Sequence, residues 1–199
     1  MGSAVGSAYI EELVSDKSVF DKSSFDQSVF DKYPALRAHH SLLQRWNSKL
    51  NLTRIDSLER NYGESLFLGE HLPAGALKIC DIGTGPGFPG FPVAVLRPDC
   101  SVTLIEAHQR KAVFLKEASR SVRNIRVMAK RAEEVHEHFD WAISRAVSAE
   151  DLAPFLTKLA ANFALLTGSE IPAISGIAWE DPIQLPDGTS RYLRIGHTV

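Results

Sequence analysis

Three glycines at alternate positions, Gly83, Gly85 and Gly87, are the residues of this 199-residue chain whose spacing points most directly to chemistry. An apolar segment at 77–82 precedes them and another at 91–96 follows, which predicts a strand, a tight loop and a helix. A backbone without Cβ atoms turns sharply and lets a ligand approach closely. Free N–H groups at the start of a helix attract a carboxylate or a phosphate. The loop therefore predicts a ligand-binding site.

The next predicted strand ends on an acidic residue, Glu106, which lies 19 positions beyond Gly87. A carboxylate there can accept hydrogen bonds from both ribose hydroxyls of a nucleoside. A nicotinamide cofactor and S-adenosylmethionine both suit this pattern. Two features favour S-adenosylmethionine: Asp81 directly before the loop suits its amino-acid end, and the C-terminal part does not form a second mononucleotide-binding half. The alternative is a tight turn followed by a surface glutamate.

Methyl transfer from a sulfonium is an in-line displacement, and a substrate nucleophile with an exposed lone pair needs no general base. Positioning and electrostatic stabilisation can then supply the catalysis. No Cys lies near the segment 144–146, as attack on a cytosine ring would require, and no Asn/Asp-Pro-Pro-aromatic run marks an adenine-amine enzyme. Arg145, at a predicted strand end, is our candidate for orienting the substrate. Its alternative role is an ion pair with a neighbouring carboxylate.

The positive charge of the chain is concentrated in residues 97–131. The net charge of the chain is −2, yet this stretch holds nine basic and three acidic residues. A basic face can attract nucleic-acid phosphates, and Arg110 and Lys111 are our candidates for substrate contacts. The alternative is a solvated helix face with scattered charges.

Composition restricts the class of protein. The chain is 44% hydrophobic and 23% charged, as in globular proteins, and no apolar run approaches the roughly 18 residues of a membrane span. No signal peptide is visible. Cys80 and Cys100 form neither a disulfide framework nor a zinc pattern, and a metal site at His136 and His138 is not expected. We expect a cytoplasmic monomer without metal.

The glycine loop and Glu106 must be held in place by a sheet, and the pattern of apolar residues predicts one. Expected strands alternate with expected helices, which predicts a parallel sheet covered on both faces. The expected strands are 77–82, 101–106, 125–129, 140–144 and 163–167, and the expected helices are 91–96, 109–122 and 151–161. In the helix 109–122, the residues expected to face the core are Val113, Phe114, Leu115 and Ala118.

The two ends of the chain differ from this alternation. Before the sheet, helices are expected at 35–50 and 59–72, and a five-residue repeat at 18–32 predicts helical turns or loop. After it, 177–185 and 191–197 predict two strands joined by a turn. The sequence thus predicts an α/β, Rossmann-like class I S-adenosylmethionine-dependent methyltransferase fold. It has a mostly parallel seven-stranded sheet, a C-terminal β-hairpin and an N-terminal helical extension, with residues 1–75 forming the extension and 76–199 the cofactor-binding domain.

Several motifs resemble one family. Trp46–Thr53 matches W-N-x-x-x-N-L-T, 81–92 matches D-x-G-x-G-x-G-x-P-G-x-P, and Ser144-Arg145-Ala146 follows in the same order. The chain resembles the small-subunit (16S) ribosomal RNA guanine-N7 methyltransferases, the glucose-inhibited division protein B family. The resemblance implies methylation of guanine N7 in small-subunit ribosomal RNA. It also places the Trp46–Thr53 segment on the substrate side, with Asn47 and Asn51 as candidate substrate-binding residues.

The loop and the resemblance together predict which residues bind S-adenosylmethionine. They are Asp81, Gly83, Thr84, Gly85, Gly87, Phe88, Glu106, Ala132, Glu133 and Arg145.

The chain also departs from the family pattern. The family usually has H-x-x-D-S where this chain has Asn61, Glu64 and Ser65, and Lys-Gly where it has Thr167 and Gly168. Two other hypotheses therefore stay open. One is a methyltransferase of the same lineage with another substrate, and the other is a binding module that keeps the cofactor pocket without turnover. The departures favour these two, whereas the motifs favour the ribosomal RNA enzyme.

Overall fold

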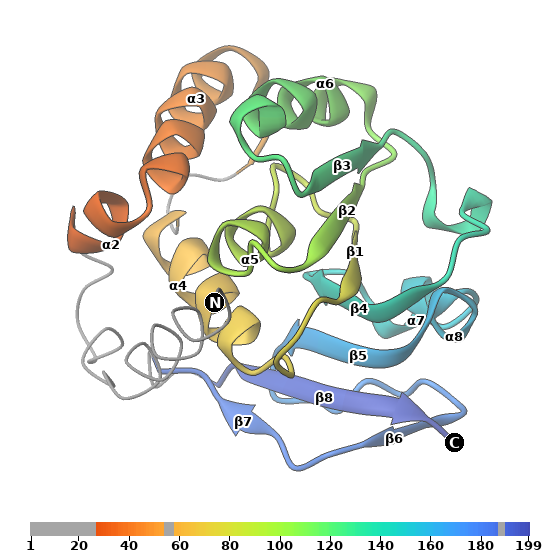
Figure 1. The fold of residues 1–199 in the computed structure, drawn as a ribbon. Helices are drawn as coiled ribbons and strands as arrows, with labels where there is room; N and C mark the ends of the chain where they lie inside the picture. Colours follow the sequence, from red (N-terminus) through yellow and green to blue (C-terminus); the bar gives the residue numbers. More distant parts are fainter. Residues whose placement is uncertain (1–26, 54–57, 187–189) are drawn as a thin grey trace, which may run out of the picture.

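A twisted sheet with helices on both faces forms the centre of the computed structural model, which describes residues 27–53, 58–186 and 190–199 (Figure 1). The strand order is β3-β2-β1-β4-β5-β8-β6, and β7 also pairs with β8. Strands β1 to β5 are parallel, and β8 runs antiparallel to β5. The strands are β1 (Lys78–Ile82), β2 (Ser101–Ile105), β3 (Ile125–Met128), β4 (Phe139–Arg145), β5 (Ala160–Thr167), β6 (Ile177–Trp179), β7 (Ile183–Gln184) and β8 (Tyr192–Thr198).

The predicted fold class is confirmed, with one difference in the strand count. The single strand expected at 177–185 is divided into β6 and β7, so the sheet has eight strands rather than seven. Pro182 lies between the two parts and has no N–H group for the ladder. Both parts pair with the same edge of β8, so the sheet remains seven strands wide. The turn at 187–188 lies outside the described residues.

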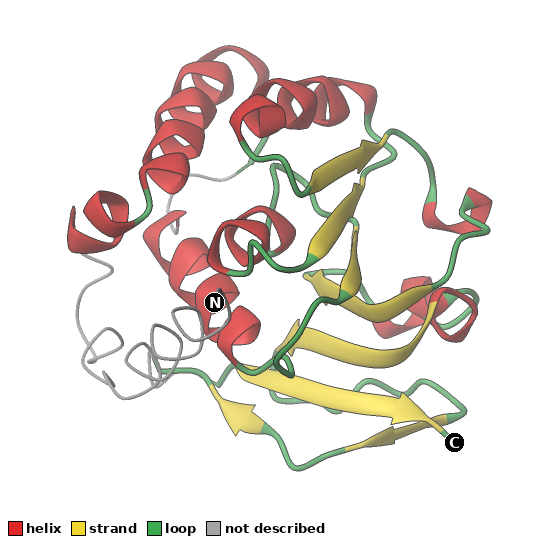
Figure 2. Ribbon diagram, viewed as in Figure 1, coloured by secondary structure: helices red, strands yellow, loops and turns green. Residues whose placement is uncertain are grey.

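The helices divide between the two faces of the sheet (Figures 1 and 2). Helices α3 to α6 lie on one face, and α7 and α8 lie on the other. The helix expected at 151–161 is wrong: two short helices occupy this region, with Pro154 in the turn between them, and Ala160 already begins β5. The helices are α2 (Gln27–Lys32), α3 (Pro34–Leu50), α4 (Leu58–Glu70), α5 (Gly90–Leu96), α6 (Gln109–Ala118), α7 (Ala149–Leu152) and α8 (Leu156–Leu159), with 3-10 turns η2 (Ser119–Ser121) and η3 (Ala132–Glu134).

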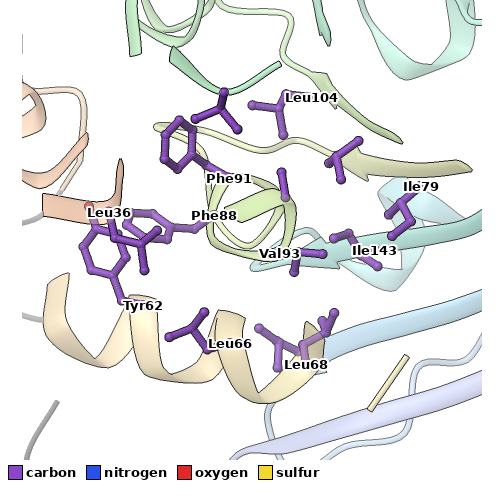
Figure 3. Close-up of a cluster of buried hydrophobic side chains, with 14 of the residues drawn as sticks. Leu36, Tyr62, Leu66, Leu68, Ile79, Phe88, Phe91, Val93, Leu104 and Ile143 are labelled. Carbon is purple, nitrogen blue, oxygen red and sulfur yellow. The ribbon is translucent and has the colours of Figure 1, made fainter. Parts of the chain in front are cut away.

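The N-terminal helices share a hydrophobic cluster with the sheet (Figure 3). Leu36 of α3 and Leu66 of α4 are buried in the same cluster as Ile79 of β1 and Leu104 of β2. The expected core position of Val113 is wrong, because its side chain is 54% exposed on the outer face of α6. The boundary between 1–75 and 76–199 stays a prediction. The part of the five-residue repeat at 18–26 lies outside the described residues, and its last part forms α2.

One polar side chain occupies the centre of this apolar cluster. His39 of α3 is 1% exposed, and its ring stacks on Phe91 at 4.2 Å between centroids. Its Nε2 lies 2.8 Å from the Pro86 carbonyl oxygen and its Nδ1 lies 2.5 Å from the Tyr62 hydroxyl. Because a carbonyl only accepts, Nε2 carries the proton and Nδ1 accepts from Tyr62. Burial lowers the pKa of His39 to about 4, which keeps the ring neutral near pH 7.

Because His39 is buried and neutral, the free energy of unfolding depends on pH. The unfolded chain takes up a proton below about pH 6.5 and the folded chain only below about pH 4. Acidification through this window therefore favours unfolding by up to about 3 kcal/mol, and this stability is regained as the pH rises. We expect the stability difference between the wild type and His39→Gln, measured by urea unfolding, to shrink between pH 7.5 and 4.5. Other titrating groups are common to both proteins, so a difference independent of pH would contradict this assignment.

Candidate functional site

The glycine loop leaves the carboxyl end of β1 and is fastened to the end of the neighbouring strand. The backbone N–H groups of Gly83 and Thr84 donate to the Ile105 carbonyl at 3.0 and 3.2 Å. Ile82 pairs in register with Ile105 of β2 and with Ser144 of β4, so three strands end at the same level. The loop therefore lies where ligands bind in open parallel sheets.

Two buried polar contacts hold the far side of the loop. The Gly90 N–H donates to Asp81 Oδ2 at 2.7 Å, and His39 donates to the Pro86 carbonyl at 2.8 Å. Asp81 is fully buried, and burial raises its pKa to about 7. A Cβ atom on Gly90 would lie 2.4 Å from Leu104 Cδ2 and 2.7 Å from Asp81 Cβ, so only glycine lets α5 begin this close to the sheet.

Gly85 and Glu106, two of the predicted cofactor-binding residues, form the open side of the loop. Gly85 has a φ of +60°, and a Cβ atom there would meet only the Gly83 carbonyl oxygen, at 4.0 Å. The Gly85 N–H donates to Glu106 Oε2 at 2.9 Å, and the His108 N–H donates to Oε1 at 2.7 Å. Each carboxylate oxygen keeps a second lone pair. This open glycine beside a fixed carboxylate fits the ribose and adenosine part of S-adenosylmethionine.

The remaining predicted cofactor residues have mixed surroundings. Thr84 is buried in the loop, and Ala132 belongs to the buried cluster that contains Ile105 at the end of β2. Glu133 is exposed in η3. The Phe88 ring points into the core, where it meets Tyr62 edge-on at 4.9 Å. These positions leave the cofactor assignments as predictions, and any contact of Phe88 would come from its backbone.

A cavity of about 640 Å³ lies beside the loop, at the carboxyl ends of β4 and β5. Its lining includes Arg145, Val147, Thr167 and Arg191. The Ser144 hydroxyl donates to the Ile82 carbonyl at 2.8 Å, which fixes the end of β4 against the end of β1. The cavity therefore lies beside the end of β1, and its lining residue Val147 approaches the loop at Gly83, where a Cβ atom would lie 2.8 Å from Val147 Cγ2.

Arg145 has the ion pair that the sequence left open as an alternative. Its Nε donates to Glu64 Oε2 at 3.0 Å, and Arg191 donates to the same oxygen at 2.8 Å. Burial lowers the pKa of Arg145, and the Glu64 carboxylate opposes this shift. Sequence reasoning did not find Arg191 or His39. The one available signal for His39 was a polar residue at helical spacing between Leu36 and Leu43.

The predicted substrate residues lie apart from this cavity lining. Asn47 Oδ1 accepts from the Thr53 N–H at 2.8 Å, and Asn51 ends α3 in the left-handed region at φ 46°. Both asparagines therefore shape the end of a helix. Arg110 is exposed and Lys111 is half-buried in the first turn of α6, four and five residues after Glu106. Their role in substrate binding stays a prediction.

Residues 27–53, 58–186 and 190–199 contain no group of three or more His, Cys, Asp or Glu side chains that could hold a metal ion. Every helix in these ranges is too short or too polar to cross a membrane.

The strand order and the glycine loop after β1 define the class I methyltransferase fold. A solved S-adenosylmethionine-dependent methyltransferase from Aquifex aeolicus is similar, with a TM-score of 0.59 and 13% sequence identity. The match covers 73% of this chain and 95% of that chain. At this identity the likeness concerns the fold alone.

Sequence comparison identifies the family within this class. The family model described as rRNA small subunit methyltransferase G (GidB) matches residues 32–176. Ribosomal RNA small subunit methyltransferase G of Prochlorococcus marinus (strain NATL2A) is 40% identical over 136 residues, covering 58% of this chain and 55% of that relative. The protein of the same name from Xanthomonas oryzae (strain KACC10331) is 37% identical over 164 residues, and this match covers 78% of this chain and 74% of that relative. The chain belongs to the GidB family, and it spans only about 55% of the length of the Prochlorococcus relative.

The close approach of α5 to the sheet predicts a stability effect at Gly90. Gly90→Ala should lower the free energy of unfolding by about 1–3 kcal/mol, because the new methyl group overlaps Leu104 and Asp81. Gly168→Ala is the matched control, since nothing lies within 4 Å of its Cβ position, and it should change stability by less than about 0.5 kcal/mol. Urea unfolding of both variants is the measurement. Equal stabilities would show that α5 does not need glycine at its start.

Proposed function

We propose that this protein is an S-adenosylmethionine-dependent methyltransferase that methylates guanine N7 in small-subunit ribosomal RNA. The observation that carries the proposal is the open cradle at Gly85 and Glu106, together with a cavity of about 640 Å³ at the carboxyl ends of β4 and β5 in the same sheet. Membership in the GidB family and the printed names of its relatives support the choice of RNA. The cytoplasmic location and the monomeric state remain predictions.

The cradle has chemistry that suits the ribose of the cofactor. Glu106 can accept from ribose hydroxyls while it holds the Gly85 N–H. Asp81, the predicted partner of the amino-acid end, is buried behind the loop and holds the Gly90 N–H, so its contact with the cofactor stays a prediction. When bound, S-adenosylmethionine supplies a methyl group on a sulfonium. The protein has to bind it and present that methyl group toward the cavity.

The cavity suits a substrate base that needs no proton transfer. Its apolar lining, including Val147 and Ile171, can pack against a base, and Arg145 can orient the substrate. Guanine N7 is already nucleophilic, so a general base is not required. Thr167 lines the same cavity, and its hydroxyl donates to the Gly168 carbonyl at 3.1 Å. The family's lysine at this position is therefore replaced by a neutral side chain, whereas Glu64 keeps an acidic group where the family has aspartate.

Cofactor binding is the first test of this proposal. Calorimetry with S-adenosylmethionine should give a Kd near micromolar, which corresponds to about 8 kcal/mol. Gly85→Val should abolish binding, because its side chain fills the open cradle. Gly176→Val is the matched control: Gly176 also has a positive φ, +78°, and open space around it, but it lies between β5 and β6. Absence of binding by the wild type at millimolar ligand would overturn the proposal.

RNA binding is the second test, and it uses the basic stretch 97–131. If this stretch contacts phosphates, Arg110→Ala with Lys111→Ala should flatten the dependence of log affinity on log salt by about two units. The control double variant, Arg37→Ala with Lys158→Ala, removes two exposed cations outside the stretch. Equal salt slopes for the two double variants would show that Arg110 and Lys111 do not contact phosphates and belong to a solvated helix face.

A further inference from the structure

Three arginines surround one buried carboxylate at the wall of the cavity. Glu64 of α4 is 4% exposed, and its Oε2 accepts from Arg145 at the end of β4 and from Arg191 just before β8. Arg60 Nε lies 3.8 Å from the other oxygen, Oε1. The group thus joins three distant segments of the chain, and two of its arginines line the cavity.

The charges in this group do not balance. One carboxylate faces three guanidinium groups, which leaves an excess of two positive charges. Glu64 Oε1 is buried without a hydrogen-bond partner in the described part of the chain. Partly buried cations in excess are costly unless another anion approaches them. The side chains of Arg145 and Arg191 are 15% and 24% exposed, so both can be reached from the cavity.

The geometry of the arginines suits a tetrahedral anion. Among the described residues, Arg145 donates only through Nε, so its two terminal nitrogens are available. A guanidinium fork matches the oxygen spacing of phosphate and can bind it through two parallel hydrogen bonds. Two carboxylates, Glu150 and Glu170, also line the cavity, but both are exposed, so water screens their charge. Among the charged side chains of the wall, the cations are therefore the more buried ones.

We propose that Arg145 and Arg191 together bind a backbone phosphate of the RNA next to the target nucleotide. Arg191 precedes β8, so the C-terminal hairpin contributes a residue to the substrate site. This inference rests on the proposed function for the identity of the nucleic acid. A different anion, the carboxylate of the cofactor, is the other partner that could reach these arginines, and the test separates the two.

The test uses Arg191→Ala, Arg191→Lys and the control Arg37→Ala, which removes an arginine of α3 that pairs with Asp31. Binding of a small-subunit RNA fragment is followed by fluorescence anisotropy over a salt series. Arg191→Ala should bind about five- to a hundredfold more weakly, with a salt slope smaller by about one unit. Arg191→Lys should recover part of the affinity, because it keeps the charge and loses the fork. Arg37→Ala should match the wild type.

Two further measurements separate this inference from the proposed function. In methylation assays, Arg191→Ala should raise KM for RNA with little change in kcat. Calorimetry with S-adenosylmethionine should give the same Kd as the wild type, and a weakened Kd would overturn the inference in favour of the cofactor carboxylate. The inference would also be overturned if Arg191→Ala had the same RNA affinity, salt slope and KM as an active wild type. A wild type that binds RNA and cofactor without methylation would overturn the proposed function alone. Urea unfolding of each variant checks that the fold persists.

Discussion

The candidate site depends on how its glycine loop is held from behind. Two hydrogen bonds inside apolar surroundings, from Gly90 to Asp81 and from His39 to Pro86, fix the side of the loop that faces the core. In such surroundings an unsatisfied polar group costs about 1–3 kcal/mol, so each bond strongly disfavours other loop conformations. The opposite side, at Gly85, is thereby left open to a ligand.

The N-terminal helices are consequently part of the site rather than an appendage to it. α3 supplies the histidine behind the loop, and α4 supplies Tyr62, whose hydroxyl holds that histidine. Two residues further along α4, Glu64 accepts hydrogen bonds from Arg145 and Arg191, which line the cavity. Tyr62 and Glu64 lie on one helix, so a shift of α4 would move the support of the loop and the arginine group together. The cradle and the cavity therefore share one rigid element.

Local sequence patterns predicted most of the fold and the pairing of the glycine loop with Glu106. The glycine loop and Glu106 are separated by a single helix and strand, so the alternation of elements was enough to bring them together. The errors came from local features that a periodic pattern ignores. Pro154 divides an expected helix and Pro182 an expected strand, and Val113 faces outward although it follows the apolar pattern of α6.

The arginine group beside the cavity could not be predicted in the same way. Glu64 is 81 residues from Arg145 and 127 residues from Arg191, and the three meet only because β8 lies antiparallel beside β5 and α4 packs across the sheet. No periodicity within a segment carries that information. From the sequence, Arg145 was expected to be a cation at the end of a strand. The alternative prediction, an ion pair, did not say which carboxylate would be its partner. Long-range ion pairs depend on strand order and helix placement, so they become visible only when the sheet is assembled.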